Sequence, residues 1–335
     1  MTGYIHDRQK ADCFCRPYFG KANMNGKIEC VLTEVGKVIL GKETVLRKVL
    51  TAILAGGHIL LDDVPGVGKT TMAVALSRTM GLEFRRIQFT PDVLPSDIVG
   101  FTLYDKNSGD FVYRPGAVSG ANLLLCDEIN RTSSRTQSAL LEAMEERQVT
   151  VDGTVYPLQD PFLVIATQNN VGTAGTQFLP YAQVDRFMVR LSIGYPDRAS
   201  QVRMLRERRL SDPMELLRCV LRKEDLLDLQ QAVREVTVRD SILEYISALT
   251  EASREHEMTE IGISPRGALF LDRFARAKAV IDGRDYVTAA DIRDSFEDVC
   301  AHRILLKSRA LTSGATVRQV FADLLQTVRV PDRGE

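Results

Sequence analysis

The sequence predicts an α/β protein in which a parallel sheet with helices on both faces is followed by a separate helical domain. Between Ile28 and Ile193, short apolar runs alternate with helical patterns, which is typical of an α/β sheet. Three of these runs are nearly continuous, as expected for parallel strands covered on both faces. After Tyr195 and Pro196 the strand signals stop, and only helical patterns remain.

The chain of 335 residues is accordingly divided into three parts. Residues 1–25 show no apolar period, so we expect a mobile N-terminal extension, and Met24 is a second candidate for the start of the chain. Residues 26–195 are expected to form the α/β core, and residues 196–335 the helical domain. The candidate strands of the core are His58–Leu61, Phe84–Gln88, Ala121–Cys126, Phe162–Thr167 and Phe187–Ile193.

The first candidate strand runs into a glycine-containing turn that ends in Gly68, Lys69 and Thr70. Such a turn, placed before a helix, exposes unpaired backbone N–H groups that attract anionic oxygens together with the helix dipole. Lys69 would add a point charge on the outer phosphates of a nucleotide, and the Thr70 hydroxyl would reach Mg²⁺. The turn therefore predicts a phosphate-binding loop, with contacts from Pro65, Gly66, Val67, Gly68, Lys69, Thr70 and Thr71.

One position of this loop departs from the general pattern GxxxxGK[ST], because Asp63 stands where the pattern has glycine. A carboxylate beside phosphates is electrostatically unfavourable, so we expect the Asp63 side chain to point away from the anion. The alternative interpretation is an ordinary turn before an amphipathic helix, since proline and glycine mark turns in general.

Two hairpins are predicted to interrupt the alternation of strands and helices. Thr102–Tyr104 faces Phe111–Tyr113 across a turn-rich segment. Thr150–Val155 carries an Asp-Gly turn between β-branched residues, which is a strong hairpin signal. Both hairpins would project from the sheet, which makes them candidates for contact with another molecule.

Two carboxylates follow the third candidate strand, at Asp127 and Glu128. They would lie at the carboxyl edge of the sheet, where nucleotides bind in open α/β folds. Asp127 is the candidate ligand of Mg²⁺, and Glu128 the candidate group that polarises the attacking water. A role in loop or helix capping is the alternative for such a pair.

A neutral amide, Asn169, follows the next strand. It could hydrogen-bond both the terminal phosphate and the attacking water without adding charge, and we assign it that sensing role. The alternative is turn chemistry, for which asparagine is common.

Two arginines complete the set of candidate catalytic residues. Arg186 lies just before the last candidate strand, from which it could reach the nucleotide of a neighbouring subunit and stabilise charge in the transition state. Arg266 follows Ser264 and Pro265, which are typical of a helix start, and a cation in a first helical turn indicates an anion nearby. The nucleotide would serve as that anion. Ion pairs within the chain or on the surface are the alternatives.

Thr288–Asp291 predicts a further helix start in the helical domain through a capping box.

The composition is that of an ordinary globular protein. The 43 Lys and Arg residues nearly balance the 44 Asp and Glu residues, so no global field favours nucleic acid. The 6 cysteines lack paired spacing, which argues against a zinc ribbon and suits a reducing compartment. No apolar stretch approaches the ~20 residues that span a bilayer. We therefore expect a cytoplasmic protein without membrane insertion.

Taken together, these motifs resemble an AAA+ ATPase, and more closely the MoxR family. The resemblance covers nearly all of residues 28–310. It rests on long runs that occur in the same order, namely Asp63–Thr70, Phe89–Asp92, Leu94–Asp97, Arg114–Gly116, Asp127–Arg131, Thr136–Met144, Ile165–Asn169, Asp185–Phe187 and Ser264–Arg266.

The resemblance implies a five-stranded parallel core followed by an all-α lid, assembled as a homo-oligomeric ring, commonly a hexamer, with ATP and Mg²⁺ between subunits. Lys69 would be the Walker lysine, Asp127 and Glu128 the Walker acid pair, Asn169 and Arg266 the two sensors, and Arg186 the arginine finger. The family tolerates aspartate at the position of Asp63. Its members act as chaperone-like motors that mature client complexes or insert metal into them, often with a partner that carries a von Willebrand factor type A domain.

Two other functions compete with this one. The same core could belong to a chelatase-type motor or a nucleic-acid translocase, although the near-neutral charge argues against nucleic acid as a partner. An ATP-gated scaffold with little turnover is the third possibility. The set of Asp127, Glu128, Asn169 and Arg186 argues against a scaffold.

Overall fold

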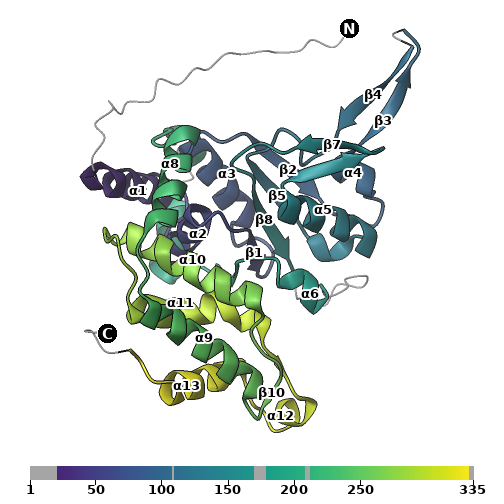
Figure 1. The fold of residues 1–335 in the computed structure, drawn as a ribbon. Helices are drawn as coiled ribbons and strands as arrows, with labels where there is room; N and C mark the ends of the chain where they lie inside the picture. Colours follow the sequence, from purple (N-terminus) through teal and green to yellow (C-terminus); the bar gives the residue numbers. More distant parts are fainter. Residues whose placement is uncertain (1–20, 108, 170–178, 208–211, 332–335) are drawn as a thin grey trace.

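Five parallel strands form the centre of the computed structural model (Figure 1). Their order across the sheet is β2-β5-β8-β1-β9, so the first strand of the chain lies inside the sheet between the last two. The strands correspond to the five predicted runs; β2 has the predicted bounds, and the ends of the other four are displaced by one or two residues. They are β1 (Ile59–Asp62), β2 (Phe84–Gln88), β5 (Leu123–Asp127), β8 (Leu163–Gln168) and β9 (Val189–Leu191).

The structure describes residues 21–107, 109–169, 179–207 and 212–331. Most of the expected N-terminal extension lies outside these residues. The first helix, α1 (Lys21–Gly36), begins within the last part of that segment.

Alternate residues of the strands bury opposite faces of the sheet, as a period of two requires. Ile59 and Leu61 belong to one apolar core, whereas Leu60 between them belongs to the other. The first core is covered by α1, α2 (Glu43–Leu54) and α3 (Lys69–Thr79). The second is covered by α4 (Pro95–Val99) and α5 (Ser134–Glu146). The predicted arrangement of a parallel sheet with helices on both faces is confirmed.

Both predicted hairpins are present. In the first, β3 (Gly100–Asp105) pairs with β4 (Asp110–Pro115) and extends away from the core at the upper right of Figure 1. In the second, β6 (Gln148–Val151) pairs with β7 (Thr154–Pro157). The rings of Tyr113 in β4 and Tyr156 in β7 stack with centroids 3.9 Å apart, so the two hairpins are in contact.

A helical lid follows the core, as predicted. Its element order is α7 (Arg198–Glu207), η2 (Pro213–Leu216), α8 (Lys223–Glu235), α9 (Asp240–Glu255), β10 (Thr259–Ile261), α10 (Pro265–Ile281), α11 (Ala289–Cys300), η3 (Ala301–Arg303), β11 (Leu305–Leu306), α12 (Ser308–Thr312) and α13 (Val317–Thr327). The short antiparallel pair of β10 and β11 is an addition to the predicted helices.

The predicted helix starts in the lid use the expected caps. The Ser264 hydroxyl accepts a hydrogen bond from Gly267 N at 3.0 Å, and Thr288 forms a capping box with Asp291. Helices α8 and α10 pack on α2, and α11 and η3 pack on β9, so the lid contacts the core at two places.

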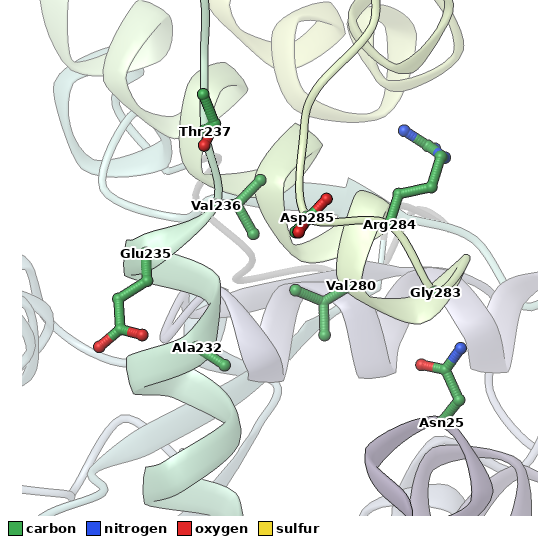
Figure 2. A pocket seen from close by; sticks show the side chains of 9 residues that line it. All are labelled: Asn25, Ala232, Glu235, Val236, Thr237, Val280, Gly283, Arg284 and Asp285. Atoms are coloured by element: carbon green, nitrogen blue, oxygen red, sulfur yellow. The ribbon is translucent and has the colours of Figure 1, made fainter. Parts of the chain in front are cut away.

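A pocket of about 310 Å³ lies where α1 meets the carboxyl ends of α8 and α10 (Figure 2). Asn25, Glu235 and Gly283 contribute to its wall. None of its lining residues belongs to the phosphate loop or to the strand ends that carry the predicted chemistry. The pocket is therefore separate from the candidate site.

Candidate functional site

The predicted phosphate-binding loop connects the carboxyl end of β1 to the start of α3. Gly66 has φ 83° and Gly68 has φ 97°, and residues that carry a Cβ atom rarely adopt this backbone conformation. Gly68 is also the N-cap of α3, so the loop turns its backbone into the helix axis at Lys69. A turn of this kind directs N–H groups and the positive end of the helix dipole toward one point, as an anion site requires.

The Asp63 side chain points away from this loop, as predicted. Its Oδ2 accepts hydrogen bonds from Ile193 N and Gly194 N at 2.6 Å each and from the Ser192 hydroxyl at 3.1 Å, while Oδ1 accepts one from Val64 N at 2.9 Å. Burial acts to raise the pKa of the Asp63 carboxyl, but these hydrogen bonds outweigh it and lower that pKa. The carboxylate thus connects the start of the loop to residues 192–194, which follow β9.

Replacing Asp63 with glycine would restore the general loop pattern, yet we expect it to destabilise the protein by about 1–3 kcal/mol. The reason is that backbone N–H groups of residues 193 and 194 would lose a charged acceptor. Asp63→Asn keeps one carbonyl oxygen and should lose less. Urea unfolding measures both variants, and a glycine variant as stable as the wild type would contradict this account.

Lys69 lies at the mouth of the loop. Its Nζ donates to Asp63 O at 2.6 Å, and Gln168 O lies 3.5 Å away. Burial lowers the pKa of the Lys69 ammonium, and the negative charge of Asp63 opposes this shift. The ammonium is therefore held by backbone oxygens beside the loop.

Asp127 and Thr70 bring two oxygen donors together. The Thr70 hydroxyl lies 3.4 Å from Asp127 Oδ2, and the Thr167 hydroxyl donates to Asp127 Oδ1 at 3.2 Å. Hydroxyl and carboxylate oxygens suit Mg²⁺, which usually binds one or two carboxylates together with water and phosphate oxygens. The residues present fit such an ion. In this structure Asp127 Oδ2 also forms an ion pair of 2.7 Å with Arg86 Nε.

Glu128 follows directly and has a left-handed backbone, with φ 56°. Its N–H donates to the Thr167 hydroxyl at 2.9 Å. Its carboxylate accepts from Gln88 Nε2 at 3.0 Å and pairs with Arg131 Nη1 at 2.7 Å. The strained backbone turns the Glu128 side chain out of the line of the strand, and these polar contacts hold it there.

Sequence reasoning missed the contacts of Arg86, Gln88 and Arg131 with the acid pair. The signal for two of them was available, because Arg86 and Gln88 are alternate residues of one strand and share a face. Strand β2 pairs with β5 so that Gln88 lies opposite Asp127. The neighbour of β5 in the sheet could not be derived from the sequence pattern, so this pairing was not foreseen.

Asn169 follows β8 at the same edge of the sheet. The register pairs Asp62 with Gln168, so Asn169 comes opposite Asp63 at the start of the phosphate loop. Its backbone oxygen accepts a hydrogen bond from Asn130 Nδ2 at 3.3 Å. The loop, the acid pair and this asparagine are thus brought together at the carboxyl edge.

The two arginines lie at the opposite edge. Arg186 precedes Val189, which pairs with Ile59, and these are the first residues of β9 and β1. Arg186 Nη1 lies 3.3 Å from Glu145 Oε2, and Arg266 is ion-paired with the same carboxylate. The anion indicated by the position of Arg266 is, within this chain, Glu145. The structure brings the two arginines together and places them apart from the phosphate loop.

A pocket of about 160 Å³ surrounds this arginine pair. His58, which precedes β1, forms part of its wall with Met144, and His58 Nε2 lies 3.1 Å from Met144 O. Burial lowers the pKa of His58 to about 4, so the ring is neutral near pH 7 and adds no charge to the two guanidinium groups.

Within the described part of the chain, no cluster of three or more His, Cys, Asp or Glu side chains could hold a metal ion. Nor does that part contain a helix with the length and apolar character needed to cross a membrane.

The fold and the strand-end residues are those of a nucleotide-binding protein, and comparison with known families agrees. The family described as "ATPase family associated with various cellular activities (AAA)" matches residues 58–189. The family described as "AAA lid domain" matches residues 251–324. The chain is an AAA ATPase with its lid, and this membership implies nucleotide binding.

The particular family follows from full-length relatives. The chain is 37% identical to Chaperone MoxR1 of Mycobacterium tuberculosis, over 91% of this chain and 82% of that protein. It is 44% identical to the uncharacterized protein YeaC of Bacillus subtilis, over 94% and 95%. A crystal structure of a protein from Cytophaga hutchinsonii superimposes with a TM-score of 0.86 at 40% identity, covering 93% of this chain and 97% of that one. The chain belongs to the MoxR family.

Proposed function

We propose that the protein is a Mg²⁺-dependent ATPase that forms a ring, commonly a hexamer, and couples ATP hydrolysis to the remodelling or maturation of a protein complex. One observation carries this proposal. The phosphate loop, Asp127, Glu128 and Asn169 meet at the carboxyl edge of the sheet, whereas Arg186 and Arg266 meet at the amino edge. The site is thus divided between two faces of one subunit.

The residues at the carboxyl edge would bind and position the reactants. Lys69 and the loop N–H groups hold the phosphates, and Thr70 with Asp127 would hold Mg²⁺, which neutralises charge on the phosphate oxygens. Glu128 orients the attacking water and accepts its proton. Asn169 would hold that water in line with the terminal phosphate.

The arginines at the amino edge would act on the nucleotide of a neighbouring subunit. A four-residue strand such as β1 spans about 13 Å, which is longer than an arginine side chain. Arg186 and Arg266 therefore do not reach the phosphate loop of their own chain across the sheet. In a ring, the same edge can face the next subunit, where two cations would stabilise transition-state charge.

This division predicts that ATP turnover per subunit rises with protein concentration, because an isolated subunit has no partner to supply arginines. Phosphate release, followed across the concentration range in which light scattering reports assembly, measures the effect. Turnover per subunit that stays flat across that range would remove the assignment of Arg186 and Arg266 to a neighbour's site.

Chaperone MoxR1 suggests a protein client, and we propose the same class of partner here, together with a partner that carries a von Willebrand factor type A domain. The remodelling of this client could include the insertion of a metal ion. The cysteine pattern favours a cytoplasmic location. Stimulation of turnover by DNA, with binding that falls steeply as salt rises, would favour a nucleic-acid translocase instead.

A further inference from the structure

We propose that Arg303 is a positioning residue that holds Arg186 and Arg266 in one fixed arrangement, so that the two arginines reach a neighbour's nucleotide as a unit. This inference rests on the proposed function of these arginines. It concerns a lid residue that lies 117 positions after Arg186 and outside the sequence motifs described above.

Arg303 donates hydrogen bonds to residues on both sides of Arg186. Its side chain is fully buried, and its Nε donates to Asp185 Oδ1 at 2.9 Å. Its Nη2 donates to Asp185 O at 2.8 Å and to Phe187 O at 2.6 Å, and its Nη1 to Met188 O at 3.2 Å. The backbone before and after Arg186 is thus bound to a single planar guanidinium group.

The same network reaches the start of the helix that carries Arg266. The Ser264 hydroxyl donates to Asp185, lying 2.9 Å from Oδ1 and 3.1 Å from Oδ2, while it accepts from Gly267 N at 3.0 Å. Ser264 is the N-cap of α10, and Arg266 lies in its first turn. Asp185, which directly precedes Arg186, is therefore hydrogen-bonded to Ser264, which lies two residues before Arg266.

Arg303 is closely packed against the first turns of α10. A Cβ atom added at Gly267 would lie 2.6 Å from the Arg303 Cδ atom, well inside a van der Waals contact. On the same helix, the Phe270 ring centroid is 5.1 Å from the Arg303 Cζ atom. The arginine thus lies between the first turns of α10 and the segment 185–188, and it fixes their spacing.

Burial makes this a rigid connection. Desolvation lowers the pKa of the Arg303 guanidinium, and the negative charge of Asp185 is among the groups that oppose the shift. A buried charge is tolerated only with its partners in place, so separating Asp185 from Arg303 is strongly unfavourable. Because Arg303 and Ser264 belong to the lid and Asp185 to the core, a displacement of the lid must carry both arginines with it.

Ser264→Ala is the least disruptive test. It removes the hydrogen bonds from the α10 cap to Asp185 but leaves the ion pair of Asp185 and Arg303 in place. We expect kcat for ATP hydrolysis to fall by about 10- to 100-fold in the assembled protein. KM for ATP and the affinity for a fluorescent nucleotide analogue should stay unchanged, because the phosphate loop lies at the other edge. Thr288→Ala is the matched control, since it removes a cap of the same lid that does not touch Asp185.

Gly267→Ala should have the same effect by displacing Arg303, whereas Gly26→Ala, where nothing lies within 4 Å of the added Cβ, should have none. Arg303→Lys should lower kcat further, because the three N–H groups of an ammonium leave one atom and cannot replace the planar guanidinium, which reaches Asp185 Oδ1 and three backbone oxygens. Thermal unfolding of each variant checks that it is folded. If the Arg303 variant does not fold, the Ser264 variant decides the question.

A double-mutant cycle separates positioning from a merely structural role. In a background of Arg186→Ala with Arg266→Ala, Ser264→Ala should cause no further loss of kcat. An equal loss in that background, or weaker binding of the nucleotide analogue, would overturn the inference. If the background variant itself retains wild-type kcat, the proposed role of the two arginines fails instead, so the two failures are distinguishable.

Discussion

Replacing Glu128 with glutamine is expected to lower the steady-state rate of ATP hydrolysis by about 10²- to 10⁴-fold while nucleotide binding persists. Glutamine keeps the shape of the side chain but cannot accept the proton of the attacking water. The hydrogen bond from Gln88 Nε2 can pass to the amide oxygen, so the side chain should remain in place.

Lys69→Ala provides the comparison, because it should abolish both binding and turnover. Removing the ammonium takes away the charge that the loop places on the outer phosphates. Phosphate release and binding of a fluorescent nucleotide analogue distinguish the two variants. If the wild type and both variants release phosphate at equal rates, the protein is not the ATPase proposed here.

The second large effect concerns Arg186. Arg186→Ala should lower turnover by about 10³- to 10⁵-fold, the range found for arginines that stabilise phosphoryl transfer. Its phosphate loop and acid pair are untouched, so the variant should bind nucleotide as the wild type does.

Mixing variants shows whether the arginine acts across subunits. A Lys69→Ala subunit lacks its own site but keeps Arg186, and an Arg186→Ala subunit has the reverse defect. A mixture of the two should recover activity that neither has alone. A mixture of Lys69→Ala with Glu128→Gln is the control, because no site in it is complete. A first mixture as inactive as its components would show that Arg186 serves its own chain or none.

The strands and the loop were predictable because their signals are local. Apolar runs such as Phe162–Thr167 can satisfy their backbone and their side chains only inside a covered sheet. The glycines of the loop need no knowledge of distant residues, since the turn itself demands φ above zero at Gly66 and Gly68. The expected direction of the Asp63 side chain followed from charge alone.

The contacts that cross between elements were not predictable in this way. Glu145 lies on a helix with no pattern that marks it, and its two arginine partners are 41 and 121 positions away, at Arg186 and Arg266. Arg303 belongs to the lid, yet it binds residues of the core. Such pairs depend on how helices return across the sheet, and a single sequence carries that information only through tertiary packing.

The stacked rings of Tyr113 and Tyr156 have a mechanical consequence for the exposed hairpin. A two-stranded ribbon fixed only at its base bends freely, whereas one held at a second point behaves as a stiff lever. Its tip carries Tyr104 and Phe111, which are 51% and 74% exposed. A force applied to these rings is therefore transmitted through Tyr156 to β6 and β7. Strand β6 directly follows the end of α5 that carries Glu145.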